Sequence, residues 1–222
     1  MSAKPNVSDV GLNPPEIPPG RFWRWAFFTE GCLIVLAILL GWLLGKPPLA
    51  HLPNFSGPFW GEWLRGIGYG FGAAVPLILL LLTMLRFPNR PWGPLVRFVE
   101  REIVTLFQSG RLWQFALVSI LAGFGEEMLF RGVLQDLLTG WFGGVTGLVL
   151  ASLLFGVGHW LTTEYAILAA IIGLYFGSIL WFCQGSLLVP IVAHAAYDFA
   201  ALLILVRWRK TAGCHDQPIV KH

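Results

Sequence analysis

Residues 113–138 read WQFALVSILAGFGEEMLFRGVLQDLL, a long apolar run that contains the charged residues Glu126, Glu127 and Arg131 near its middle. A helix needs about 20 mostly apolar residues to cross the hydrocarbon core of a bilayer, and this run is long enough. Charged groups inside a membrane are costly and are retained mainly where they are paired or functional. The stretch therefore predicts a membrane-spanning helix that carries a polar site.

The composition of the whole chain indicates an integral membrane protein. Of its 222 residues, 56% are hydrophobic and 12% are charged, whereas about 25% of residues are charged in a typical soluble domain. The 11 Trp residues fit this setting, because Trp favours the membrane–water interface. The net charge of +3 agrees with attraction to anionic lipid. No pattern in the sequence indicates binding to nucleic acid.

Six apolar stretches predict an all-α, polytopic transmembrane helix bundle of about six spans. They cover residues 25–45, 66–85, 113–138, 143–160, 164–183 and 186–206. Charged and apolar residues alternate over 92–111, which predicts an amphipathic helix on the membrane surface. Glycines four residues apart, such as Gly66 with Gly70 and Gly173 with Gly177, predict close helix packing within the bundle.

The basic residues predict the orientation of the bundle. With six spans, one side receives Lys46 and Arg65, and the other receives Lys4, Arg21, Arg24, Arg86, Arg90, Arg97, Arg101, Arg111, Arg207, Arg209, Lys210 and Lys221. Because cytoplasmic loops are enriched in basic residues, both termini are expected to be cytoplasmic. The chain is expected to begin with a flexible cytoplasmic tail at 1–20, followed by a two-span region with the amphipathic segment at 21–112. A core with the polar residues is expected at 113–206, and a cytoplasmic C-terminal tail at 207–222.

Ionisable residues are few within the spans, and the first group of them lies in the sequence GEEMLFR at 125–131. Glu127 and Arg131 are four residues apart on a helix, so they are able to pair and to reduce each other's cost of burial. Glu126 points about 100° away and is left free, which suits a general base or acid. The alternative is a structural ion pair with Glu126 incidental. Glu30, early in the first span, is expected to be solvated.

Two further groups contain histidine. Phe155 begins the sequence FGVGH, which ends at His159, and His194 begins HAAYD, which ends at Asp198. A helix places His194 and Asp198 on one face, where the carboxyl group can orient the imidazole or join it in binding a substrate. A single histidine near the end of a span is more often structural than catalytic. Three such groups on separate helices favour a functional site.

In order, spacing and apolar setting, these groups resemble the motifs of the CAAX prenyl protease and bacteriocin-processing family of intramembrane endopeptidases. Its members carry Glu-Glu-x-x-x-Arg, then Phe-x-x-x-His, then His-x-x-x-Asn or Asp. The resemblance covers roughly residues 113–206 and includes FRG after the glutamates and SLLVP before His194. It implies a protease that forms no covalent intermediate, in a multi-pass protein of the bacterial plasma membrane.

The resemblance also implies a role for each residue. Glu126 and His159 are expected to activate a water molecule, and His194 and Asp198 to contact the tetrahedral intermediate. An ionised Asp would repel an oxyanion where Asn would donate a hydrogen bond, so Asp198 is expected to act protonated or to orient His194. The supporting residues are Glu127, Arg131 and Phe155.

The same residues leave a metal alternative open. His159, His194 and Glu126 are able to hold zinc with one coordination position free. However, the His-Glu-x-x-His signature is absent, and these ligands would come from three helices. We therefore expect no cofactor and keep zinc as the alternative.

Two classes of function remain open from the sequence. The first is an endopeptidase that acts on a membrane-associated peptide or protein at the bilayer. The second is a non-catalytic membrane protein, such as a proton-coupled carrier or an immunity-type scaffold, that uses the same charges for packing. Nothing in the sequence identifies the substrate or the oligomeric state.

The depths of the three groups in the membrane raise a geometric question. If each span is a straight helix, the position of a residue along it gives its depth in the membrane. By this measure His159 lies nearer the end of its span than Glu126 and His194 do. The groups meet only if helices tilt, if the helix continues past Trp160, or if the chain bends around a water-filled cavity. Because hydrolysis needs water, we expect a cavity that opens toward the cytoplasm.

Overall fold

The computed structural model describes residues 18–53, 59–88 and 90–212, and within them every regular element is a helix. The predicted all-α bundle is confirmed. Its long helices are α1 (Pro19–Leu43), α2 (Phe59–Arg86), α5 (Leu112–Glu127), α7 (Gly144–Gly158), α8 (Thr163–Phe182) and α9 (Leu188–Ala212). Most of the two expected tails, residues 1–17 and 213–222, lies outside the described residues. α9 continues beyond Arg207, where the C-terminal tail was expected to begin.

Four helices in the described part of the chain are long and apolar enough to cross a membrane, and their apolar parts are Gly20–Leu43, Trp60–Arg86, Thr163–Phe182 and Leu188–Val206. The other two expected spans differ from the prediction. α7 has 15 residues, fewer than the roughly 20 that a span needs. Over 113–138 the helix changes its hydrogen-bonding pattern, because α5 leads into the π-helix η4 (Met128–Gln135) and then α6 (Asp136–Phe142). The predicted number of spans is therefore approximate.

The segment predicted to be amphipathic is helical from α3 (Gly93–Phe98) through the π-helix η3 (Val99–Ile103) to α4 (Val104–Phe107). Leu95 and Val96 are buried, whereas Arg97 and Arg101 are exposed. The buried side chains join apolar residues of α2 and α9 in one cluster. This face therefore covers the bundle itself.

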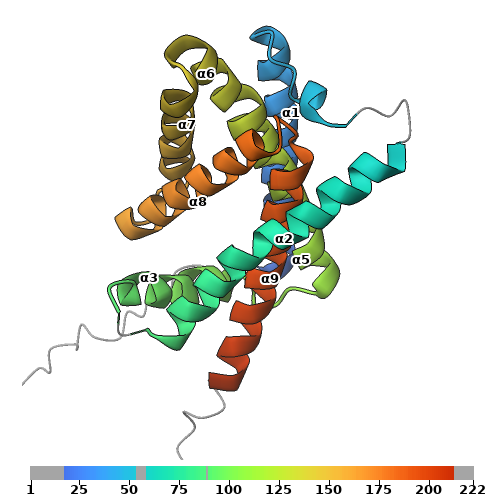
Figure 1. Ribbon diagram of the computed structural model, residues 1–222. Coiled ribbons are helices and arrows are strands. Elements are labelled where there is room, and N and C mark those ends of the chain that lie inside the picture. The colour runs from blue at the N-terminus through green and yellow to red at the C-terminus, as the bar shows by residue number, and fades with distance from the viewer. Residues whose placement is uncertain (1–17, 54–58, 89, 213–222) are drawn as a thin grey trace, which may run out of the picture.

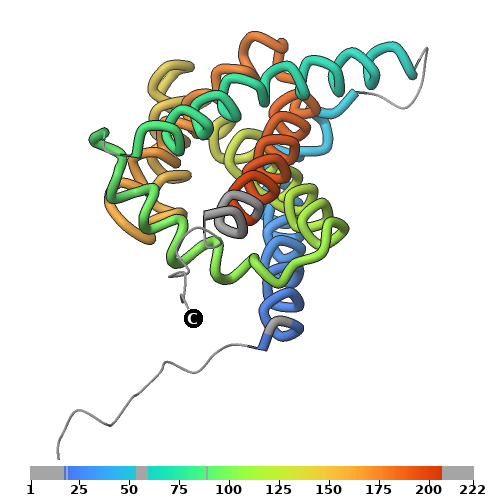
Figure 2. Tube along the Cα trace, turned by 90° about the horizontal axis from the view of Figure 1, so that it is seen from below, coloured from blue at the N-terminus to red at the C-terminus, as the bar shows by residue number. Residues whose placement is uncertain are grey.

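α5 packs between α1 and α9, and α2 crosses α9 obliquely (Figures 1 and 2). A helical hairpin of α7 and α8 lies beside this group (Figure 1). Two of the predicted glycine contacts join α2 to α9: a Cβ would lie 2.6 Å from Leu188 Cδ2 at Gly66 and 2.5 Å from Val192 Cβ at Gly70. The expected role of these glycines in packing within the bundle is confirmed.

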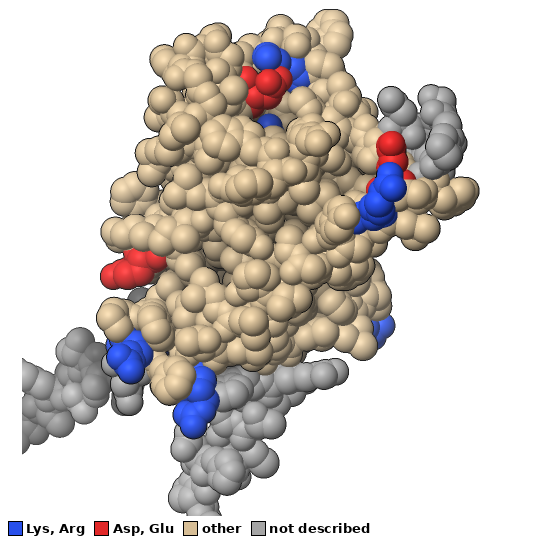
Figure 3. Space-filling model, in the orientation of Figure 1, with Lys and Arg blue, Asp and Glu red and all other residues tan. Residues whose placement is uncertain are grey.

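Large apolar side chains cover much of the outer surface. Trp42 is 80% exposed and Phe182 is 87% exposed. On the face in Figure 3 the charged side chains lie around the margins, and the middle of the face is uncharged. Such a surface is suited to contact lipid, as expected for an integral membrane protein.

Candidate active site

The seven residues that the motifs single out meet inside the bundle. They are Glu126 and Glu127 at the end of α5, Arg131 in η4, Phe155 in α7, His159 directly after α7, and His194 and Asp198 in α9. Gly123 allows α5 to approach α9, since a Cβ there would lie 2.8 Å from the carbonyl oxygen of Ile191. This contact holds the helix of the two glutamates against the helix of His194.

Glu127 is fully buried and contacts two cationic or potentially cationic groups. Its Oε1 atom accepts a hydrogen bond from Arg131 Nη1 at 3.0 Å, which is the predicted pair one turn apart. The same oxygen lies 2.8 Å from His194 Nδ1. Glu127 therefore orients His194 as well as neutralising Arg131. The second contact was not predicted, because it joins residues 67 positions apart in the sequence.

Arg131 ties η4 to the α7–α8 hairpin. Its Nη2 atom donates to the carbonyl oxygen of Gly173 at 3.1 Å, and its guanidinium group lies 4.4 Å from the centre of the Phe155 ring. One turn later, Gln135 Nε2 donates to the carbonyl oxygen of Gly177 at 3.2 Å. The motifs did not include Gln135. A signal was present in the sequence, because the two donors Arg131 and Gln135 are four residues apart and so are their acceptors, Gly173 and Gly177.

Glu126 has a different environment from its neighbour. It is 8% exposed, and its Oε2 atom is buried without a hydrogen-bond partner in the described part of the chain. That atom lies 3.5 Å from His159 Nε2 and 3.9 Å from His194 Nε2. The free carboxyl group expected from the helix periodicity is therefore present, and it faces both imidazole rings at distances longer than a hydrogen bond.

His159 lies beside Glu126 because α7 ends early. The helix ends at Gly158, and His159 is its C-terminal capping residue. The Nδ1 atom of His159 lies 2.9 Å from the carbonyl oxygen of Phe155. Since a carbonyl only accepts, Nδ1 carries the hydrogen atom, and Nε2 faces Glu126. A continuation of the helix past Trp160, one of the alternatives left open by the sequence, is not observed.

Asp198 lies one turn after His194, as predicted, with its Oδ2 atom 3.4 Å from His194 Nε2. The His194 ring stacks on Phe176, with ring centres 4.9 Å apart and planes inclined by 17°. His194 is thus held by Glu127 at Nδ1 and by Phe176 on its face. Its Nε2 atom is turned toward Glu126 and Asp198.

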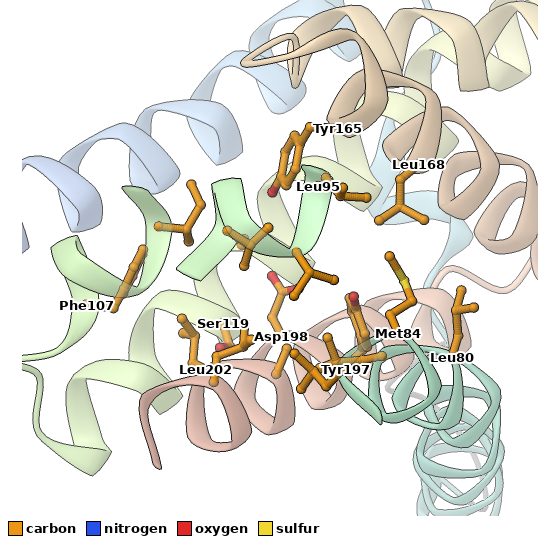
Figure 4. A pocket seen from close by; sticks show the side chains of 18 of the residues that line it. Leu80, Met84, Leu95, Phe107, Ser119, Tyr165, Leu168, Tyr197, Asp198 and Leu202 are labelled. Atoms are coloured by element: carbon orange, nitrogen blue, oxygen red, sulfur yellow. The ribbon is translucent and has the colours of Figure 1, made fainter. Parts of the chain in front are cut away.

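Two cavities adjoin these side chains. The smaller, of about 120 Å³, is lined by Glu126, His159, His194 and Asp198 together with aromatic residues. The larger, of about 290 Å³, is the pocket in Figure 4, and most of its wall is aliphatic. Glu126 and Asp198 line both cavities, so the two spaces meet at the candidate active site.

The larger cavity extends from Glu126 toward the start of α5 and the end of α9. On α5 it is lined by Ser119, which precedes Glu126, and on α9 by Leu202, which follows Asp198. The distribution of basic residues assigns these helix ends to the cytoplasm. The cavity therefore lies on the expected side of the site, while the orientation itself stays a prediction.

Two tyrosines that the motifs did not single out also line both cavities. Tyr165 lies near the start of α8, with its ring centre 6.4 Å from that of His159. Tyr197 precedes Asp198 in the HAAYD sequence. Their phenol groups add polar surface to the two spaces, as Figure 4 shows for the larger one.

The possible zinc ligands considered from the sequence were His159, His194 and Glu126. Within residues 18–53, 59–88 and 90–212, no group of three or more His, Cys, Asp or Glu side chains is arranged to hold a metal ion. The expectation that the protein works without a cofactor stays a prediction.

The fold and the site together define a polytopic α-helical membrane protein with a buried carboxyl–imidazole centre. Residues 108–200, which include every residue of that centre, match the family described as type II CAAX prenyl endopeptidase Rce1-like. This segment of the chain is therefore similar to a family of intramembrane proteases.

A curated bacterial protein is also similar to this chain. The chain is 30% identical over 142 residues to the uncharacterized protein YpbD of Bacillus subtilis (strain 168). The match covers 61% of this chain and 66% of the length of YpbD. No solved structure matches the chain. The match to the protease family lies on the segment that carries the site.

Proposed function

We propose that this chain is an intramembrane endopeptidase that hydrolyses peptide bonds of membrane-associated proteins or peptides, either CAAX-type substrates or precursors of bacteriocins and signalling peptides. The observation that carries the proposal is the unpaired Glu126 Oε2 atom, which is buried beside two imidazole rings and opens onto a cavity. The family of residues 108–200 supports the same reaction.

In the proposed mechanism, Glu126 and His159 activate a water molecule. Glu126 removes one proton, and His159 Nε2 accepts a hydrogen bond from the same water, because its Nδ1–H is bound to the Phe155 carbonyl. The water oxygen bonds to the carbonyl carbon of the substrate, and an electron pair moves onto the carbonyl oxygen. Glu126 then passes its proton to the amide nitrogen, the electron pair on the oxyanion re-forms the C=O bond, the C–N bond breaks, and the amine leaves.

His194 is proposed to stabilise the oxyanion. Because its Nδ1–H donates to Glu127, a donor at Nε2 requires the ring to carry a second proton. Glu127 and Asp198 lie on either side of the ring and balance that positive charge. An ionised carboxyl group would repel an oxyanion. We therefore assign Asp198 to orienting His194 and balancing its charge, and not to contact with the oxyanion.

Glutamate-dependent hydrolysis without a metal is the form of the mechanism that we propose. The alternative, zinc held by His159, His194 and Glu126, is tested by chelation of the purified protein. Cleavage is expected to survive o-phenanthroline and EDTA at full rate. Loss of cleavage that added zinc restores would replace the proposed mechanism with the metal-dependent one.

The main test compares the wild-type protein with Glu126→Gln and His159→Ala in lipid nanodiscs, using an internally quenched, farnesylated CAAX peptide as the probe. Each variant is expected to remain folded and to lose at least about a hundredfold in cleavage rate. Glu62→Gln, on an exposed position of α2, is the matched control and should cleave at the wild-type rate.

The result that would overturn the proposal is cleavage at the wild-type rate by both site variants. It would favour the non-catalytic alternative, a proton-coupled carrier or an immunity-type scaffold. The Glu126→Gln variant also serves to identify the natural substrate. Peptides that are released from cells expressing the wild type, and not from cells expressing Glu126→Gln, are the products of the enzyme.

A further inference from the structure

Glu30 in α1 is an acidic residue that neither the motifs nor the proposed mechanism uses. The sequence predicts a solvated carboxyl group near the membrane interface. In the structure, Glu30 lines the larger cavity instead, and its Oε2 atom is buried with no hydrogen-bond partner among the described residues. The expectation of a solvated group is therefore wrong, and Glu30 shares a cavity with Glu126.

Close packing of α1 on α5 sets the position of Glu30. A Cβ at Gly125 would lie 3.0 Å from Leu33 Cβ and 3.1 Å from the carbonyl oxygen of Glu30. The starts of the two helices are also in ring contact, so the helices run parallel. Because side chains on a helix lean toward its N-terminus, the Glu30 carboxyl group points along α5 from Gly125 toward Ser119.

Ser119 supplies a second unpaired group on this wall. It is 1% exposed, it lines the larger cavity (Figure 4), and its hydroxyl oxygen has no hydrogen-bond partner within the described ranges. Other helical hydroxyl groups donate to the carbonyl one turn earlier, as at Thr29, Thr83, Ser152 and Ser178. The Ser119 hydroxyl group remains available to a molecule in the cavity.

The larger cavity combines an aliphatic wall with the Glu30 carboxyl group, which forms no ion pair within the described ranges. Glu30, Glu126 and Asp198 line it, and its described lining residues include no Lys, Arg or His. The buried Arg131 is already matched by Glu127. An unpaired carboxylate in a low-dielectric setting is costly unless it takes up a proton or a cation offsets it. The ligand that fits is a cationic group on an apolar stem.

We propose that the larger cavity binds a protonated amine, with Glu30 as the carboxyl group that accepts its hydrogen bonds and Ser119 as a further acceptor. This assignment rests on the proposed peptidase function and adds the chemistry of the substrate to it. The amine has two possible sources: the α-amino group that hydrolysis creates on the released peptide, or a lysine side chain close to the scissile bond. Leu80 and Leu202 contact the apolar part in either case.

Binding of short peptides tests this site without turnover. The first pair of probes is trileucine amide with a free amino group and its N-acetylated form. The second pair is N-acetylated tripeptide amides with lysine or norleucine between two leucines. Calorimetric titration into wild-type protein in nanodiscs, corrected with empty nanodiscs, is expected to show roughly tenfold tighter binding of the cationic member of one pair. The pair that shows the difference identifies the source of the amine.

Glu30→Gln keeps the shape of the side chain and is expected to remove this preference while leaving the neutral probes unaffected. Glu62→Gln is the matched control and should keep the preference. Equal binding within both pairs, or a preference that survives Glu30→Gln, would overturn the amine site. The comparison on wild-type protein decides the question even if the variant fails to fold. A preserved amine preference in a protein that cleaves no peptide would count against the proposed protease alone.

Discussion

Glu126 and Glu127 are neighbours in the chain, yet they face two regions of the molecule that are built differently. On the Glu127 side, the Oε1 atom accepts from both Arg131 and His194, and Gln135 Nε2 donates to α8, although Glu127 Oε2 and Gln135 Oε1 have no hydrogen-bond partner among the described residues. On the Glu126 side, the carboxylate oxygen has no hydrogen-bond partner in the described chain, and the unpaired Ser119 hydroxyl lines the same cavity.

Under the proposed function, this difference separates the residues that hold the site together from the residues that act in it. Buried polar groups that are paired fix the helices in one arrangement, because breaking any pair leaves a costly orphan. Unpaired groups beside a cavity reduce stability and remain available to a substrate, as is common at functional sites. Substitutions on the two sides should therefore have opposite effects on folding and on activity.

Removing Glu127 should have the largest effect on folding. Glu127→Ala leaves the buried Arg131 without its carboxylate and releases His194 Nδ1. Loss of one partner of a buried ion pair costs about 3–5 kcal/mol. We expect the variant to unfold at a clearly lower temperature than the wild type, or to yield no folded protein. Tryptophan fluorescence during thermal unfolding in detergent measures the change.

Glu126→Gln is the matched change on the other side. It removes a buried charge whose Oε2 atom makes no hydrogen bond in the described part of the chain, so its unfolding temperature should equal or exceed that of the wild type. If Glu126→Gln were as destabilising as Glu127→Ala, both glutamates would be structural, and the division between the two sides of α5 would be wrong.

Gly123→Ala tests whether the site depends on the close approach of α5 to α9. The added Cβ would lie 2.8 Å from the carbonyl oxygen of Ile191, so the helices must separate. Such overpacking costs about 1–3 kcal/mol. Because Glu126 and His194 lie on these two helices, we expect peptide cleavage to fall by a larger factor than the stability loss alone explains.

The control for this change is Gly68→Ala in α2, where nothing lies within 4 Å of an added Cβ. It should leave both cleavage and unfolding temperature unchanged. Wild-type cleavage by folded Gly123→Ala would mean that the spacing of the two helices does not govern the chemistry.

Helix periodicity alone was enough to predict much of the site. The pairing of Glu127 with Arg131, the free position of Glu126 and the placement of Asp198 beside His194 all follow from a spacing of about one turn. The apolar runs were enough to predict a helical membrane bundle. These features are local, so they can be read from short stretches of sequence.

Features that depend on packing between distant segments could not be predicted in this way. The contact of Glu127 with His194 joins two helices far apart in the chain. The prediction for Glu30 was wrong because it used only the position of the residue along α1. The packing of α1 on Gly125 of α5 brings Glu30 to the cavity. The early end of α7 at Gly158 also has no clear signal, because the apolar character of the sequence continues to Trp160.

Two buried serines give the smallest expected effects and the finest test of the difference between the two regions. Ser152 donates to the Leu148 carbonyl at 2.7 Å, so Ser152→Ala should cost about 1 kcal/mol. Ser119 is equally buried but has no hydrogen-bond partner in the described part of the chain. Ser119→Ala should therefore change stability by less than about 0.5 kcal/mol, as compared by thermal unfolding of the two variants side by side. A larger loss at Ser119 than at Ser152 would mean that the cavity wall is held together by this hydroxyl group, and that side of α5 would then be structural as well.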